Sequence, residues 1–317
     1  MAPPAELLAL LDRRVAALTR ARPGLADALA LQQQLIRAGL TSARPPQVAP
    51  FPTPRELVAS RVRQGIPLLH DQPASVDLHF AADLFSRLVN LVQQQPSDEE
   101  MQVKLQVLVR AATSGALDPE RLFGEAIVQH RDHLSELAVR AGVDDDLLVA
   151  LAGQAVQPLL RAYAEHLQPF VDRVDDGSPD GAVWQRGYCP VCGAWPVLGE
   201  LRGVELAEFL RCSVCGTAWR WPRIACPYCA TDDFRQLRTL QVEGEQRFRI
   251  SVCERCSTYL KIGNAFDPPP AELLALDDVA SMHLDVAAIE RGYHRPSGSG
   301  FSIELAVPDA EWVEELA

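Results

Sequence analysis

Apolar residues recur every three or four positions through roughly the first 173 residues, which is the spacing of the buried face of an α-helix. Examples are Leu7, Leu11, Val15 and Leu18 near the start, Leu84, Leu88 and Leu91 in the middle, and Leu148, Leu151 and Leu159 near the end. Asp118 followed by Pro119 has the form of a helix N-cap and first helical residue, and Ser97 with Glu100 has capping-box spacing. The pattern predicts a bundle of several helices.

Beyond about residue 180 the period changes from helical to alternating. The run 247–252 alternates polar with apolar side chains and therefore predicts a strand. An apolar segment that ends at Val242 precedes a turn at Gly244, so we expect a hairpin there, and Gly203 offers a comparable turn earlier in the chain. A short helical stretch over 273–289 and an acidic tail follow.

Two breaks interrupt these patterns. Residues 43–54 hold five prolines and predict an extended linker, and the polar stretch 175–181 predicts the main domain boundary. The expected class is α+β. The predicted divisions are a helical bundle over 1–180, a first four-cysteine module over 181–222, a second over 223–265, and a C-terminal helix and tail over 266–317.

All eight cysteines fall within one stretch of 68 residues, in four Cys-x-x-Cys pairs. The predicted metal ligands are Cys189, Cys192, Cys212 and Cys215 in one set and Cys226, Cys229, Cys253 and Cys256 in the other. Two residues between thiolates let both sulfurs reach one tetrahedral ion, and two such pairs complete four ligands. A closed shell of four thiolates has no open position for a substrate, so the sites are typical of structural or electron-holding centres.

Two other uses of the cysteines are less favoured. A lone Cys-x-x-Cys is often a catalytic dithiol, but four pairs at these spacings favour metal. Joining Cys212 and Cys215 to Cys226 and Cys229 would nest the two sites and leave the repeat unexplained, so sequential pairing is the hypothesis.

The composition of the chain bears on its expected compartment and on the kinds of partner it can bind. The net charge is −12, so the average surface repels nucleic acid and anionic lipid. The most apolar stretch, 147–160, is interrupted by Gly153, Gln154 and Gln157, and no membrane span is expected. Clustered thiols without a recognisable export signal predict a cytoplasmic protein.

Aromatic residues gather around the cysteines and raise the possibility of stacking on single-stranded bases. Region 183–265 has 11 Lys and Arg against 8 Asp and Glu, and eight thiolates with two divalent ions turn this excess of +3 into −1. A nearly neutral surface binds phosphate poorly, so packing over the metals is the favoured interpretation.

These cysteine segments resemble the FdhE family of formate dehydrogenase accessory proteins. The matching segments begin at Tyr188-Cys-Pro-Val-Cys192 and Arg211-Cys-Ser-Val-Cys215, continue through Cys226-Pro-Tyr-Cys229 and Cys253-Glu-Arg-Cys-Ser-Thr-Tyr-Leu-Lys261, and end between Asp277-Asp278 and Gly292-Tyr293. The resemblance implies a cytoplasmic assembly factor that binds the formate dehydrogenase catalytic subunit, with rubredoxin-like iron sites in both modules. Zinc is the alternative occupant, since both ions accept four thiolates.

Other side chains add no catalytic group. His130 and His133 are one turn apart, but the sequence places no third ligand and a solvated helix face is favoured. No phosphate loop, nucleophile elbow or zinc-protease pattern occurs, so no enzyme activity is expected. The alternatives to an assembly factor are a rubredoxin-like electron carrier and a zinc-ribbon protein that binds nucleic acid.

Overall fold

The structure is a computed structural model, and it describes residues 4–42, 55–73, 77–95, 99–174 and 183–306. The proline-rich linker, Ser97 of the capping box, the polar break and most of the acidic tail lie outside these residues. The predicted domain boundary near residue 180 therefore remains a prediction.

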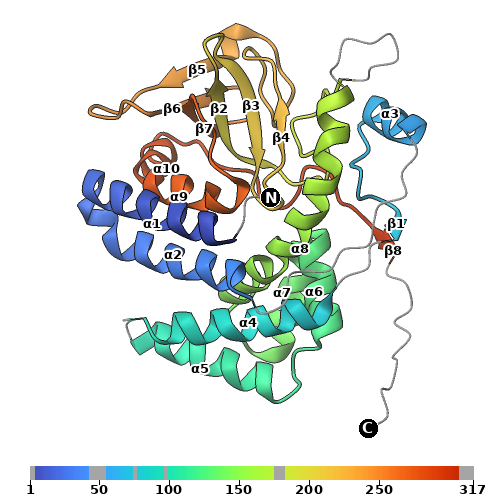
Figure 1. The fold of residues 1–317 in the computed structure, drawn as a ribbon, viewed down its shortest axis with the longest axis vertical. Helices are drawn as coiled ribbons and strands as arrows, with labels where there is room; N and C mark the ends of the chain where they lie inside the picture. The colour runs from blue at the N-terminus through green and yellow to red at the C-terminus, as the bar shows by residue number, and fades with distance from the viewer. Residues whose placement is uncertain (1–3, 43–54, 74–76, 96–98, 175–182, 307–317) are drawn as a thin grey trace.

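Eight helices precede the sheet in the described part of the chain (Figure 1). They are α1 (Pro4–Ala21), α2 (Ala26–Leu40), α3 (Arg55–Gln64), α4 (Leu78–Gln93), α5 (Glu99–Thr113), α6 (Pro119–Val128), α7 (Arg131–Ala141) and α8 (Asp145–Val174). Asp118 caps α6 as the sequence predicts, because its side chain accepts a hydrogen bond from the N–H of Glu120. The predicted helical character of this region is confirmed.

Helix α8 is the central helix of this half. It has the length and apolar character of a membrane-crossing helix, but half of its most apolar window is buried inside the protein. Val156, Leu159 and Leu160 are almost inaccessible to solvent, and α4, α6 and α7 pack around the helix. Its C-terminal turns run beside the sheet, so the helical core and the sheet share one hydrophobic cluster (Figure 1).

Six strands form one mixed sheet in the order β4-β3-β2-β7-β6-β5. They are β2 (Pro196–Arg202), β3 (Ala207–Cys212), β4 (Ala218–Arg220), β5 (Leu237–Leu240), β6 (Phe248–Cys253) and β7 (Thr258–Ala265). The three strands of each module pair antiparallel, while β2 and β7 pair in parallel, from Leu198 opposite Lys261 to Arg202 opposite Ala265. A separate parallel pair joins β1 (Gln72–Pro73) to β8 (Leu305–Ala306).

Both predicted hairpins are present. β5 pairs with β6 across the turn at Gly244, and β2 pairs with β3 across the turn at Gly203. Both glycines have positive φ, where a side chain would be strained. Phe248, Ile250 and Val252 of β6 are buried on one face, in agreement with the alternating pattern.

The predicted C-terminal helical stretch consists of a 3-10 turn (Ala271–Leu273), α9 (Leu274–Ala280) and α10 (Met282–Ile289). Leu284 belongs to the same hydrophobic cluster as Ile250 of the sheet, and Leu276 belongs to another cluster together with Leu11 of α1. The short helices thus lie between the sheet and the α1–α2 pair (Figure 1). The α+β fold class is confirmed: N-terminal helices, a six-stranded sheet with both four-cysteine clusters, and short C-terminal helices.

Candidate metal centres

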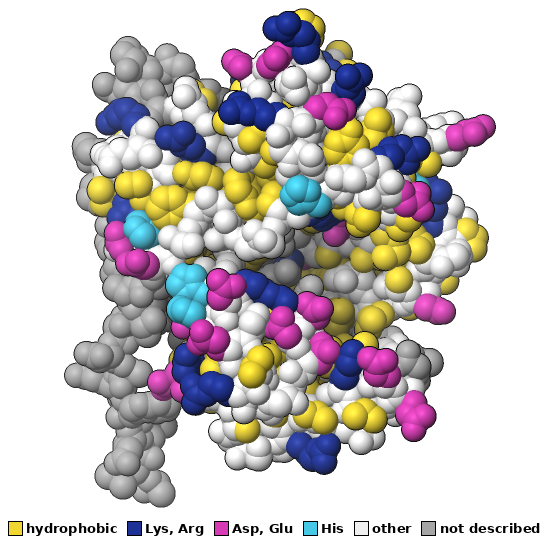
Figure 2. All heavy atoms as spheres, turned by 180° about the vertical axis from the view of Figure 1, so that it is seen from behind, with side chains coloured by type: hydrophobic (Ala, Val, Ile, Leu, Met, Phe, Trp, Pro, Cys, Tyr) yellow, Lys and Arg dark blue, Asp and Glu magenta, His cyan; other side chains and the backbone are white. Residues whose placement is uncertain are grey.

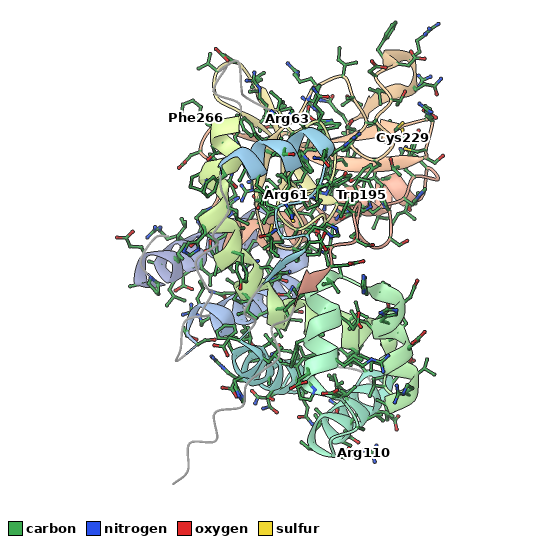
Figure 3. The ribbon with its side chains drawn as sticks, turned by 90° about the vertical axis from the view of Figure 1, so that its right-hand side faces the viewer. Arg61, Arg63, Arg110, Trp195, Cys229 and Phe266 are labelled. Atoms are coloured by element: carbon green, nitrogen blue, oxygen red, sulfur yellow. The ribbon has the colours of Figure 1, made fainter. Side chains whose placement is uncertain are left out.

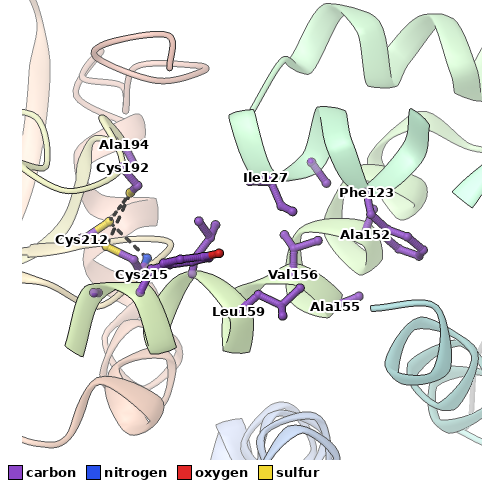
Figure 4. Packing of buried hydrophobic residues seen from close by; sticks show 14 of the residues in the cluster. Phe123, Ile127, Ala152, Ala155, Val156, Leu159, Cys192, Ala194, Cys212 and Cys215 are labelled. Atoms are coloured by element: carbon purple, nitrogen blue, oxygen red, sulfur yellow. Dashed lines mark hydrogen bonds between the residues drawn. The ribbon is translucent and has the colours of Figure 1, made fainter. Parts of the chain in front are cut away.

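The first cluster consists of Cys189, Cys192, Cys212 and Cys215, and all four side chains are buried. Sγ of Cys192 lies 3.4 Å from Sγ of Cys212 and 3.5 Å from Sγ of Cys215. Figure 4 shows these thiols beside the hydrophobic core, which continues along α8 through Leu159 and Val156. The cluster is therefore part of the same core that holds the helical half to the sheet.

The second cluster consists of Cys226, Cys229, Cys253 and Cys256. Sγ of Cys226 lies 3.7 Å from Sγ of Cys256, and the same distance separates Cys229 from Cys253. Cys229 and Cys256 are partly exposed to solvent, unlike any thiol of the first cluster. Figure 3 shows Cys229 in the sheet half of the molecule, at the opposite end from Arg110.

The same local backbone builds both clusters. The N–H of Cys189 donates to the carbonyl of Ala194, and the N–H of Cys226 donates to the carbonyl of Thr231, each at 2.8 Å. This tight turn requires positive φ just after the pair, at Gly193 and at Ala230. Within the turns, backbone N–H groups point at sulfur; that of Val214, for example, lies 3.3 Å from Sγ of Cys212.

A threonine hydroxyl lies against each cluster, a feature that is not among the predictions from the sequence. Oγ1 of Thr217 is 3.0 Å from Sγ of Cys215, and Oγ1 of Thr258 is 3.0 Å from Sγ of Cys256. Both threonines occupy the second position after the last cysteine of their module, which is a repeat visible in the sequence. A hydroxyl there can donate to a thiolate and stabilise its charge.

The donor set fits a four-thiolate ion. Four sulfurs about 2.3 Å from one tetrahedral ion are separated from one another by about 3.8 Å, close to the separations in both clusters. The predicted sequential pairing is confirmed and the nested alternative is wrong, because Cys212 and Cys215 lie with Cys189 and Cys192. The eight cysteines are free, without disulfides.

Burial makes the first cluster costly to ionise without a cation. It raises the pKa of the Cys189 and Cys192 thiols well above the ordinary value, and it also raises the pKa of Cys226. For Cys215, hydrogen bonds from the other three thiols and Thr217 outweigh burial and lower the pKa. Burial therefore disfavours four thiolates at this site unless a positive ion is bound to them.

The aromatic residues near the clusters pack against one another. Trp184 contacts Tyr188, Tyr188 contacts Trp195, and Trp195 contacts Tyr228, at ring-centroid distances of 5.6, 6.1 and 5.3 Å. This chain of rings connects the first module to the second. These contacts agree with the interpretation favoured from the sequence, in which the aromatic residues pack within the protein and do not stack on bases.

A third group of possible ligands lies in the helical half. Glu125 contacts both His130 and His133, and the three ligand atoms lie within 4.8 Å of one another. The sequence placed no third ligand here because Glu125 precedes the histidines on a different helix.

Comparison with known proteins places this arrangement in context. Residues 224–301 match the family model described as FdhE, C-terminal domain, a range that includes the second cluster and not the first. The chain is 31% identical over 155 residues to Protein FdhE homolog of Aquifex aeolicus (strain VF5), covering 48% of this chain and 51% of that protein. It is 37% identical over 123 residues to Protein FdhE of Escherichia coli O127:H6, covering 37% of this chain and 38% of that protein.

The chain therefore matches only about half, or less, of the length of these curated relatives. A solved structure matches far more of it: the crystal structure of the FdhE protein from Pseudomonas aeruginosa covers 93% of this chain and 95% of its own. The TM-score is 0.57 and the sequence identity 24%, so this likeness shows a shared fold.

Proposed function

We propose that this chain, which belongs to the FdhE family, is a cytoplasmic accessory protein needed for the maturation of active formate dehydrogenase. In this role it binds the catalytic subunit of that enzyme and does not itself turn over substrate. The observation that carries the proposal is the pair of four-cysteine clusters built on one sheet, of which the second lies within the region that matches the FdhE C-terminal domain.

Each cluster would hold one ion, with iron as the proposed occupant and zinc as the alternative. Iron would supply a one-electron couple at each site, whereas zinc would be redox-silent. The chain supplies four sulfurs per ion, backbone N–H groups aimed at them, and a threonine hydroxyl. With all four positions filled by protein, the clusters serve to shape a surface and not to activate water.

The charge distribution supports a protein partner over nucleic acid. Acidic and basic side chains are interspersed over the face shown in Figure 2, without one large basic area. The whole chain carries a net charge of −12. Such a surface lacks the positive field on which nonspecific binding to phosphate depends.

The test combines binding with genetics. The full-length protein, purified anaerobically, is used to capture the formate dehydrogenase catalytic subunit from its own host, and metal content is measured on the same sample. A strain that lacks the gene is assayed for formate oxidation and complemented with the parent protein or with Cys229→Ser. We expect capture of the subunit, loss of formate oxidation in the deletion strain, and restoration by the parent but not by the variant.

Two outcomes would overturn the proposal. One is normal formate oxidation in the deletion strain; the other is failure to capture the subunit under conditions in which metal analysis finds both clusters filled. Arg235→Ala serves as the matched complementation control, since Arg235 is exposed and lies outside both clusters.

A rubredoxin-like electron carrier is the second candidate, and the partial exposure of Cys229 and Cys256 favours it at the second cluster. Exposure of a thiolate shortens the path for an electron to a partner. An anaerobically purified protein that is colourless and shows no reversible couple by voltammetry would exclude this function and leave the accessory role standing.

A further inference from the structure

A carboxylate and two imidazoles meet at the junction of α6 and α7, away from the cysteine clusters. Oε2 of Glu125 lies 2.9 Å from Nδ1 of His130 and 3.0 Å from Nδ1 of His133. The two imidazole rings stand nearly perpendicular, at an interplanar angle of 82° with centroids 5.1 Å apart. Each ring thus directs its Nδ1 atom toward the same carboxylate oxygen, Oε2 of Glu125.

The backbone explains why these three side chains converge. Gln129, between the helices, adopts a left-handed conformation with φ of 60°, which ends α6 and turns the chain into α7. The N–H of His130 donates to the carbonyl of Glu125, which places the histidine beside the glutamate. His133 then follows one turn into α7 on the same side.

The junction is held by contacts outside the group itself. The side-chain amide of Gln129 donates to the carbonyl of Cys192, at 3.1 Å, and so connects the turn to the first cluster. The side chains of His130 and Glu125 are mostly buried, with 31% and 22% of their surface exposed, whereas 50% of the His133 side chain is exposed. The ligand atoms are therefore positioned by the fold but remain reachable from solvent.

A cavity of about 350 Å³ adjoins the group formed by Glu125, His130 and His133. It is separate from a cavity of about 390 Å³ between α2 and α4. Its lining includes Glu120, Glu125 and Glu304 against a single basic residue, Arg121. An excess of carboxylates favours a cation there. The space also leaves room for water or a partner's side chain beside an ion held by the three ligands.

We propose that Glu125, His130 and His133 form a third metal site, which binds a divalent first-row transition-metal ion of the zinc type. Two imidazole nitrogens and one carboxylate oxygen are a donor set that such ions accept, and they leave coordination positions open. Ligands about 2.1 Å from one ion lie roughly 3.0 to 3.4 Å apart in octahedral or tetrahedral geometry. The nitrogen-to-oxygen distances here need only small side-chain adjustments to reach that range.

This site differs chemically from the cysteine clusters, and that difference makes it testable. Full-length protein with both clusters saturated with Zn²⁺ is titrated with Co²⁺, followed by calorimetry and visible absorption. We expect one further equivalent of Co²⁺, with the d–d bands of nitrogen and oxygen ligands and without thiolate-to-metal charge transfer. Arg121→Gln should tighten this binding, because it removes the one positive charge from the lining.

Variants of the ligands provide the decisive comparison. His133→Ala and Glu125→Gln should each weaken Co²⁺ binding by more than the roughly 10- to 100-fold that loss of a supporting contact costs. His166→Ala is the matched control, because His166 is an exposed histidine on α8 that bonds to the carbonyl of Ala162. It should bind Co²⁺ like the parent.

The site does not exist if the parent binds no Co²⁺ beyond the cysteine clusters, or if the added Co²⁺ shows thiolate charge transfer. Retention of full affinity by both His133→Ala and Glu125→Gln would also refute it. Near-ultraviolet circular dichroism and the Zn²⁺ content of each variant establish that its fold and its clusters are intact, so a loss of Co²⁺ binding reports on the ligands.

Discussion

The ammonium of Lys261 lies 2.7 Å from Oδ2 of Asp285, and the lysine side chain has no exposed surface. The same ammonium donates to the carbonyl of Asp278, and Arg295 also pairs with both aspartates. This network joins β7 to the short C-terminal helices. Lys261 is thus the charged centre of the interface between β7 and these helices.

Substitution of Lys261 should destabilise the protein strongly. Removing one partner of a buried ion pair leaves the remaining charge without compensation, at a cost of about 3 kcal/mol or more. We expect Lys261→Met to lower the midpoint of urea unfolding accordingly. Arg235→Ala removes an exposed pair with Asp233 and should change stability by less than about 1 kcal/mol. Equal effects of the two substitutions would contradict the buried network.

Metal should leave the two clusters at different rates. The four thiols of the first cluster are buried in the main core, while Cys229 and Cys256 of the second are partly exposed. With a colorimetric chelator in excess, we expect a fast phase of one equivalent from the second cluster and a slow phase that accompanies unfolding. Cys229→Ser should abolish only the fast phase; loss of the slow phase instead would reverse the assignment.

Removing the ion from the first cluster should also unfold the helical half near it. The cluster shares its hydrophobic core with α8, and metal contributes on the order of 10 kcal/mol to folding in small thiolate domains. We expect Cys192→Ser to lower the helical circular dichroism signal, and Cys229→Ser to leave it near the parent value. An undiminished helical signal in Cys192→Ser would show that α8 folds independently of the cluster.

Stability should fall as the pH rises from about 4.5 to 7 because of Glu208. Burial raises the pKa of this carboxyl to about 7 from an ordinary value of 4.5, although Arg249 and Arg223 oppose the shift. The folded state therefore holds a proton that the unfolded chain releases, and stability decreases between about pH 4.5 and 7, by on the order of 3 kcal/mol. Glu208→Gln should remove this decrease, and the two unfolding curves should differ least below pH 4.5. Parallel pH profiles would contradict the assignment.

Two glycines should respond oppositely to alanine. A Cβ at Gly187 would lie 1.7 Å from the carbonyl oxygen of Pro227 in the second module, so Gly187→Ala must displace backbone and should cost about 3 kcal/mol. A Cβ at Gly153, within α8, meets nothing within 4 Å. Gly153→Ala should stabilise by about 0.5 to 1 kcal/mol, measured by thermal unfolding. A tolerated Gly187→Ala would refute the close approach of the modules.

Sequence patterns between residues close in the chain predicted much of the fold. The hairpins at Gly203 and Gly244 and the helices before residue 174 follow from periodicity and turn chemistry, which act between residues close in the chain. The cysteine spacing likewise predicted both clusters, since each Cys-x-x-Cys pair fixes two ligands in one turn. Residues that act locally were therefore predictable.

Contacts between segments far apart in the chain were not predictable from the sequence. Nothing in the pattern of β2 or β7 specifies that they pair in parallel, because their strand sequences fit either a separate or a shared sheet. The meeting of Glu125 with His130 and His133 depends on a left-handed residue, Gln129, which is an unusual choice at such a position. The burial of Lys261 could be predicted only if its ion pairs with Asp278 and Asp285 were known.

The parallel ladder between β2 and β7 has a practical consequence for how the protein can be divided. A polypeptide that starts at residue 224, where the family match begins, would keep β7 and its partner β6 but lose β2, the strand on the other side of β7. The N–H and C=O groups from Lys261 to Ala265 would then form an open strand edge, which is a template for self-association. The segment that matches the family model is thus shorter than the piece of this chain that covers this edge of β7.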